Sequence, residues 1–139
     1  MEQRFKHFTN SLGRIYCSIR YHENIRTLSV IWKGTASEED LASLKSEISE
    51  MINHFKVDYI LNDLEELFSE AIDSLIYLKL SEWDAEAFNL KIKQIVHVLR
   101  PDTALANQYL KQENKNPHFK FFDNKVDAIL YLTELQEKA

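Results

Sequence analysis

Residues 15–34 read IYCSIRYHENIRTLSVIWKG, and this stretch decides the fold. Side chains alternate with a period of two on both sides of the polar tripeptide at 22–24, which predicts two strands joined by a short turn. The alternating apolar positions of the two strands are Ile15, Cys17, Ile19, Tyr21, Leu28, Val30 and Trp32. Gly34 ends the second strand. The stretch therefore predicts an antiparallel hairpin.

The sequence after this hairpin alternates helical and strand patterns. Apolar residues recur at spacings of three and four from Leu41 to Phe55, which predicts an amphipathic helix that Ser37 can cap. Short apolar runs predict strands over 57–61, 92–99 and 119–122. Further helices are expected over about 69–88, after 102, and after a cap at 123 or 124. This order predicts an α/β fold: a mixed, mostly parallel sheet opened by an antiparallel hairpin, with helices.

Residues 1–14 have no clear strand period. Phe5, Phe8 and Leu12 recur at spacings of three and four, which is the spacing of one helical turn. No linker-like change of composition follows, and no repeat has a fixed period. We therefore expect an N-terminal extension over 1–14 and one domain over 15–139.

Composition narrows the functional classes. The 139 residues include 17 basic and 22 acidic side chains, for a formal net charge of −5, and an acidic domain is a poor candidate for nucleic-acid binding. A single cysteine allows no internal disulfide, so we expect a reducing compartment, the cytoplasm. No apolar run approaches the roughly 20 residues that span a bilayer, and we expect no membrane span.

Several segments resemble the SpoIIAA-like group of STAS domains, which are small bacterial single-domain proteins. These segments are LSVIWKG at 28–34, LND at 61–63, FFD at 121–123, AI at 128–129 and YL at 131–132. The resemblance covers roughly residues 15–135 and rests mainly on hydrophobic scaffold. It implies a STAS fold and a non-catalytic regulatory or protein-interaction module, as in anti-sigma-factor antagonists, with an unknown protein as its partner. Its surface would lie around the second helix and the preceding loop.

The resemblance also implies a possible phosphoacceptor, because such antagonists are switched at a Ser or Thr after the third strand. Ser69 is the nearest candidate. Glu65, Glu66 and Glu70 surround it, and a phosphate would add about two negative charges beside these carboxylates. An ordinary helix N-cap is our first interpretation of Ser69, and a phosphosite is the alternative.

Polar residues at the ends of the predicted strands form a candidate ligand or partner surface. Ligands of parallel sheets bind beyond the carboxyl ends of the strands, where the sequence places Asn62, Asp63, Arg100 and Asp123. The alternative interpretation is that each residue caps a helix or forms a turn. Aromatic residues suggest a second candidate, a pocket for a lipid or another apolar molecule near Tyr77, Trp83 and Phe88.

Catalytic chemistry has no recognisable motif. The five histidines lack metal-ligand spacing, and with two glycines the chain has neither a phosphate-binding loop nor a nucleophile elbow. We therefore expect no enzyme activity, no metal and no cofactor. The leading hypothesis is the interaction module, the alternative is a small-ligand binding protein, and a homodimer through an edge strand or a helix face is a further possibility.

Overall fold

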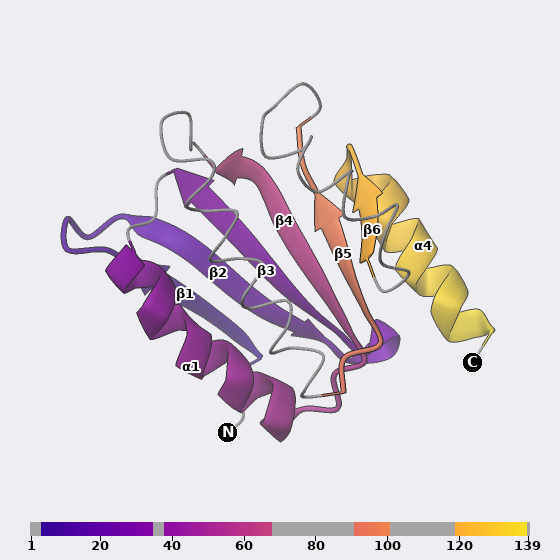
Figure 1. Ribbon diagram of the computed structural model, residues 1–139. Coiled ribbons are helices and arrows are strands. Elements are labelled where there is room, and N and C mark those ends of the chain that lie inside the picture. Colours follow the sequence, from indigo (N-terminus) through magenta and orange to yellow (C-terminus); the bar gives the residue numbers. More distant parts are fainter. Residues whose placement is uncertain (1–3, 35–37, 68–90, 101–118, 139) are drawn as a thin grey trace.

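The hairpin predicted from residues 15–34 lies inside a larger sheet (Figure 1). The computed structural model describes residues 4–34, 38–67, 91–100 and 119–138. Within these residues the sheet has six strands, which lie side by side in chain order: β1 (Phe5–Thr9), β2 (Ile15–His22), β3 (Thr27–Gly34), β4 (Tyr59–Leu67), β5 (Gln94–Val98) and β6 (Phe119–Phe122). The helices are α1 (Glu38–His54), α4 (Lys125–Glu137) and the short 3-10 helix η1 (Glu23–Ile25).

Strand β2 is antiparallel to both of its neighbours, and all later pairs in the sheet are parallel. In the β2–β3 hairpin, Cys17 lies opposite Trp32 and Tyr21 lies opposite Leu28. η1 forms the turn of this hairpin, and Arg26 leaves it in the left-handed region at φ 48°. The predicted fold class, a mixed and mostly parallel sheet opened by an antiparallel hairpin, is confirmed.

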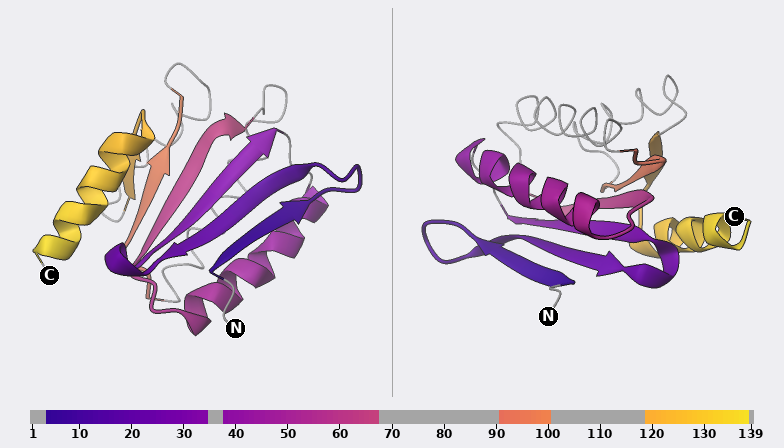
Figure 2. Two further views of the ribbon diagram at one scale, coloured as in Figure 1. Left: turned by 180° about the vertical axis from the view of Figure 1, so that it is seen from behind. Right: turned by 90° about the horizontal axis from the view of Figure 1, so that it is seen from below.

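Helices α1 and α4 lie on opposite faces of the sheet (Figure 2), and each covers an apolar cluster. The larger cluster lies under α1, whose Leu41, Leu44 and Ile48 are buried against the strands. The smaller cluster lies under α4, which packs against β4, β5, β6 and η1 on the opposite face. The side of β1–β3 that faces away from α1 is therefore covered by neither helix (Figure 2, left). We call this region the uncovered half-sheet.

The cap of the last helix follows the sequence prediction. Asn124 is extended, and its side-chain oxygen accepts the backbone N–H of Asp127 at 2.9 Å. Such a cap satisfies one of the donors that a helix start leaves without a partner. The predicted helices over 69–88 and after 102, together with Ser37 and Ser69, lie outside the described residues.

Two predictions of local structure were wrong. Residues Phe5–Thr9 form an edge strand rather than a helical turn, because the free edge of β2 offers them backbone hydrogen bonds along their whole length. The strand predicted over 57–61 runs on to Leu67, because β3 continues beside it and pairs Lys33 with Glu66. Asn62 and Asp63 therefore lie within β4 instead of beyond its end.

Candidate functional site

A groove of about 520 Å³ lies on the uncovered half-sheet, beside the start of α4. Charged, polar and apolar side chains from β1, β2, β3, β4 and α4 line it together. These are Phe5, His7, Ser18, Ile31, Lys33, Asp63, Glu65, Glu66 and Lys125. The groove thus combines residues that are more than 100 positions apart in the chain, which only the sheet order brings together.

The wall formed by β1 and β2 is held by a hydrogen bond between two side chains. Nδ1 of His7 and Oγ of Ser18 are 2.7 Å apart, because the antiparallel register places these residues directly opposite each other. The ring of Phe5 meets the His7 imidazole edge to face at 4.4 Å. These contacts restrain the imidazole at the edge of the groove.

The wall formed by β4 carries a carboxyl pair. Asp63 and Glu65 are two positions apart, so their side chains lie on the same face of the strand. Asp63 is only 6% exposed, and its Oδ1 accepts the backbone N–H of Glu65 at 3.1 Å. Burial raises the pKa of Glu65, and the neighbouring charge and hydrogen bond of Asp63 raise it further, while Lys125 lowers it. Keeping Glu65 ionised in the groove therefore costs free energy.

Two lysines, Lys33 and Lys125, also line the groove. Within residues 4–34, 38–67, 91–100 and 119–138, neither lysine forms an ion pair with Asp63 or Glu65. Both kinds of charge are thus available to an incoming group: carboxylates for a cation and ammonium groups for an anion. No set of three or more His, Cys, Asp or Glu side chains in the described part of the chain is placed to hold a metal ion.

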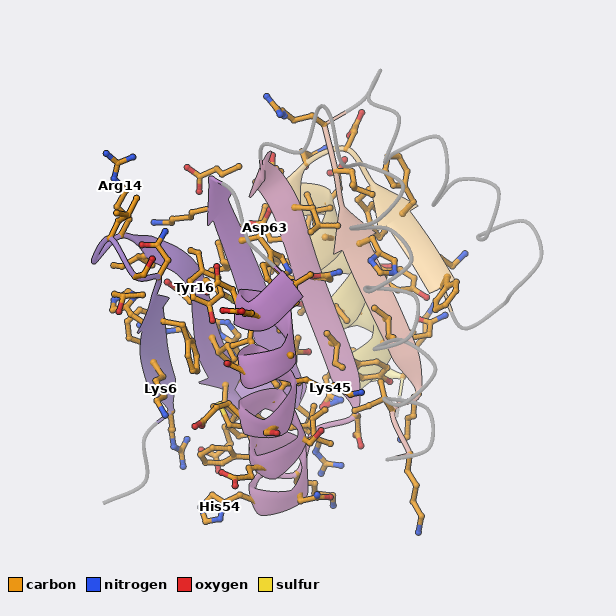
Figure 3. All side chains as sticks on the ribbon, turned by 60° about the vertical axis from the view of Figure 1, so that its left-hand side comes forward. Lys6, Arg14, Tyr16, Lys45, His54 and Asp63 are labelled. Carbon is orange, nitrogen blue, oxygen red and sulfur yellow. The ribbon has the colours of Figure 1, made fainter. Side chains whose placement is uncertain are left out.

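The structure separates the two residues of β4 that the sequence placed on one surface. Asp63 lines the groove, whereas its neighbour Asn62 faces the α1 side and is 5% exposed. Asn62 Oδ1 accepts the indole N–H of Trp32 at 2.7 Å, and its Nδ2 lies 3.3 Å from Nδ1 of His97. Asn62 is therefore part of a buried polar chain and offers no surface to a partner. Figure 3 shows the position of Asp63 on β4.

Arg100 and Asp123 are exposed beyond the ends of β5 and β6. Neither is among the described residues that line the groove. Asp123 accepts a hydrogen bond from the side-chain Nδ2 of Asn124 at 2.8 Å, which fits the turn role considered from the sequence. The remaining predicted site residues, Ser69, Tyr77, Trp83 and Phe88, lie outside the described residues.

Of the nine residues that line the groove, Asp63 alone was predicted as a site residue from the sequence. His7, Ser18 and Lys125 are among the eight that were not. His7 and Ser18 escaped notice because residues 5–9 were interpreted as a helical turn. A strand interpretation would have placed Phe5, His7 and Thr9 on one face. The position of Lys125 had no local signal, since the packing of α4 decides it.

Comparisons with known proteins concern the fold. No protein-family model matches the sequence, and no curated protein matches it. An uncharacterized DUF3478-family protein from Shewanella loihica PV-4, described as having a SpoIIAA-like fold, has a TM-score of 0.54 with 18% sequence identity; the match covers 92% of this chain and 93% of that one. This chain has a SpoIIAA-like fold.

A second solved structure agrees with the SpoIIAA-like fold. It is the Bacillus cell fate determinant SpoIIAA in its phosphorylated form, with a TM-score of 0.50 and 14% identity over 84% of this chain and 98% of that one. The similarity therefore extends over most of this chain and nearly all of the other, as expected for a shared architecture. In the described part of the chain, no helix is long and apolar enough to cross a membrane.

Proposed function

We propose that this protein is a non-catalytic, cytoplasmic regulatory module of the STAS type, which binds a partner protein through the groove on its uncovered half-sheet. The observation that carries the proposal is the groove itself: two lysines and three acidic residues line one depression on a SpoIIAA-like fold. The SpoIIAA-like fold supports an interaction module in general terms. The single cysteine supports the reducing compartment.

The charge pattern of the groove suits a partner segment that carries charges of its own. Asp63 is buried and Glu65 is half-buried, so a partner's lysine or arginine would gain more from them than from freely solvated carboxylates. Lys33 and Lys125 would repel a purely basic segment and favour one of mixed charge. Charge complementarity of this kind contributes to specificity and to the association rate.

The proposal is tested by reversing a charge on the wall of the groove. Glu66→Lys changes an exposed lining residue, and Glu134→Lys makes the same change on an exposed part of α4 that does not line the groove. Proteins captured from the native host by the wild-type chain are compared quantitatively with those captured by each variant. We expect at least one protein to be retained by wild type and Glu134→Lys and to be lost with Glu66→Lys. Identical captured sets for both variants would contradict the groove as the binding surface.

We propose Ser69 as the residue at which the module would be regulated, if it is a phosphoacceptor rather than an N-cap. SpoIIAA of Bacillus has been solved in a phosphorylated form, which motivates the experiment. Labelled phosphate transfer from host extract is compared between the wild-type chain and Ser69→Ala. Labelling of wild type alone supports regulation at Ser69, and equal labelling of both chains rejects it.

The alternative function is an apolar-ligand carrier. We do not favour the groove as its site, because seven of the nine residues that line the groove are charged or polar. Tyr77, Trp83 and Phe88 lie outside the described part of the structure, so this alternative stays a prediction. Native mass spectrometry of freshly purified protein tests it directly. A co-purified apolar molecule would support the carrier, and the bare chain mass would reject it.

A further inference from the structure

The outer edge of β1 presents backbone groups that β2 does not use. At one end of the strand, the N–H of Tyr21 donates to the carbonyl of Arg4 at 2.7 Å; at the other end, the N–H of Asn10 donates to the carbonyl of Arg14 at 2.9 Å. In an antiparallel pair, hydrogen-bonded positions alternate along the strand. Residues 4, 6, 8 and 10 therefore face β2, and the N–H and C=O groups of Phe5, His7 and Thr9 point outward.

This edge has few of the features that protect an edge strand. Residues 5–9 contain no proline, and the register shift near the end of the pairing places its extra residue, Tyr16, in β2, so β1 itself stays regular. The only lysine of the strand, Lys6, is held by Glu47 at 3.0 Å on the α1 side. Figure 3 shows Lys6 on β1. Among the described elements, β2 alone pairs with β1, which forms the outermost strand in Figures 1 and 2.

We propose that a second copy of this chain pairs with β1 through an antiparallel two-fold interface centred on His7, which makes one continuous sheet. The sequence predicted a homodimer through an edge strand or a helix face, and the strand geometry now points to one strand and to its register. Outward-facing residues of each strand form hydrogen-bonded pairs in this arrangement: His7 lies opposite the partner's His7, and Phe5 lies opposite the partner's Thr9. Each of these pairs exchanges two backbone hydrogen bonds.

Self-complementarity favours a second copy over an unrelated extended peptide. An aromatic residue opposite a β-branched residue is a favourable cross-strand pair, and the two-fold axis forms the Phe5–Thr9 pair twice. On the α1 side, Lys6 lies opposite the partner's Phe8. Lys6 already lies over its own Phe8 ring, with Nζ 5.2 Å from the centroid, so the same cation–π chemistry extends across the axis. Phe5 is 41% exposed, and pairing with the second copy would bury part of its side chain.

Cysteine cross-linking tests the register. Cα atoms of a hydrogen-bonded antiparallel pair are about 5.5 Å apart, which suits a disulfide. His7→Cys should therefore give a covalent dimer under mild oxidation. Phe5→Cys alone should not, because the two copies of position 5 lie about 14 Å apart along the strands. A mixture of Phe5→Cys and Thr9→Cys chains should give the mixed disulfide. The native Cys17 is fully buried and contributes no background.

Backbone pairing is tested separately by sedimentation over a micromolar concentration series. His7→Pro removes an outward N–H that β2 does not use, and His7→Ala removes the same side chain but keeps that N–H. We expect wild type and His7→Ala to dimerise and His7→Pro to remain monomeric, with circular dichroism confirming that each is folded. A monomeric wild type, or a dimeric and folded His7→Pro, would overturn the proposal. If His7→Pro does not fold, the cross-linking pattern decides, and equal cross-linking of the His7→Cys and Phe5→Cys chains would reject the register.

Discussion

The indole N–H of Trp32 donates to the side-chain oxygen of Asn62 at 2.7 Å, in the buried layer between the sheet and α1. His97 continues this chain on β5, directly opposite Asn62 in the parallel register. A buried donor that loses its acceptor carries its full desolvation cost. The three side chains therefore link β3, β4 and β5 through polar contacts that an apolar core alone would not specify.

Removing the acceptor at position 62 should destabilise the protein. We expect Asn62→Ala to lower the free energy of unfolding by about 1–3 kcal/mol in urea denaturation. Trp32→Phe removes the donor, and the double variant should lose less than the sum of the two single changes because the residues are in contact. Additive single effects would contradict an energetic coupling between Trp32 and Asn62.

Acid should weaken the fold through His97. Burial lowers the pKa of His97 to about 3, from an ordinary value of 6.5. Below pH 6.5 the unfolded chain takes up a proton that the folded protein refuses, so stability falls as the pH drops towards 3. The slope from this one group is at most about 1.4 kcal/mol per pH unit.

Urea midpoints measured at neutral pH and about two units lower check the His97 prediction. His97→Gln keeps a group that can accept a hydrogen bond from Asn62 and does not titrate, so it should lose less stability on acidification than wild type. His54→Gln, at an exposed histidine, is the matched control and should behave as wild type. Equal acid sensitivity of wild type and His97→Gln would show that other groups dominate.

Glu65 should make stability depend on pH in the opposite direction to His97. Its raised pKa means that the folded state holds the proton more tightly than the unfolded chain. The stabilisation that this proton gives the folded state is present below the ordinary pKa of 4.5, and it is lost as the pH rises through the pKa of the folded protein. Glu65→Gln should therefore stabilise the protein at neutral pH, by less than about 1 kcal/mol, with a smaller gain in acid. Glu66→Gln, at the exposed neighbour, is the control; an equal gain there would point to net charge instead of the burial of Glu65 and its contact with Asp63.

The thiol of Cys17 should be inert in the folded protein. Cys17 is fully buried, and burial raises the pKa of its thiol, so little reactive thiolate is present. We expect no reaction with a thiol-specific chromogenic reagent under native conditions and one equivalent of reaction in denaturant. Rapid native labelling would show that the strand opens around Cys17.

Side-chain periodicity predicted the hairpin, the parallel strands and the cap of α4 because these features depend on neighbours in the sequence. Every second residue of β2 and β3 is apolar, since one side of each strand must face the apolar layer under α1. These residues are Cys17, Ile19 and Tyr21 in β2, and Leu28, Val30 and Trp32 in β3. The apolar residues spaced three and four apart from Leu41 to Phe55 predicted a helix whose apolar side must also be buried against the sheet.

Tertiary structure alone decided what each strand face contacts. Asn62 and Asp63 are adjacent polar residues, and the sequence placed both on a surface. In the structure, strand alternation sends Asn62 into the core beneath α1, and Asp63 into the groove on the other side. Phe5 and Phe8 fit the spacing of a helical turn, and the segment Phe5–Thr9 becomes a strand because the edge of β2 satisfies half of its backbone groups. The same pairing leaves the outward half of those groups facing away from the sheet.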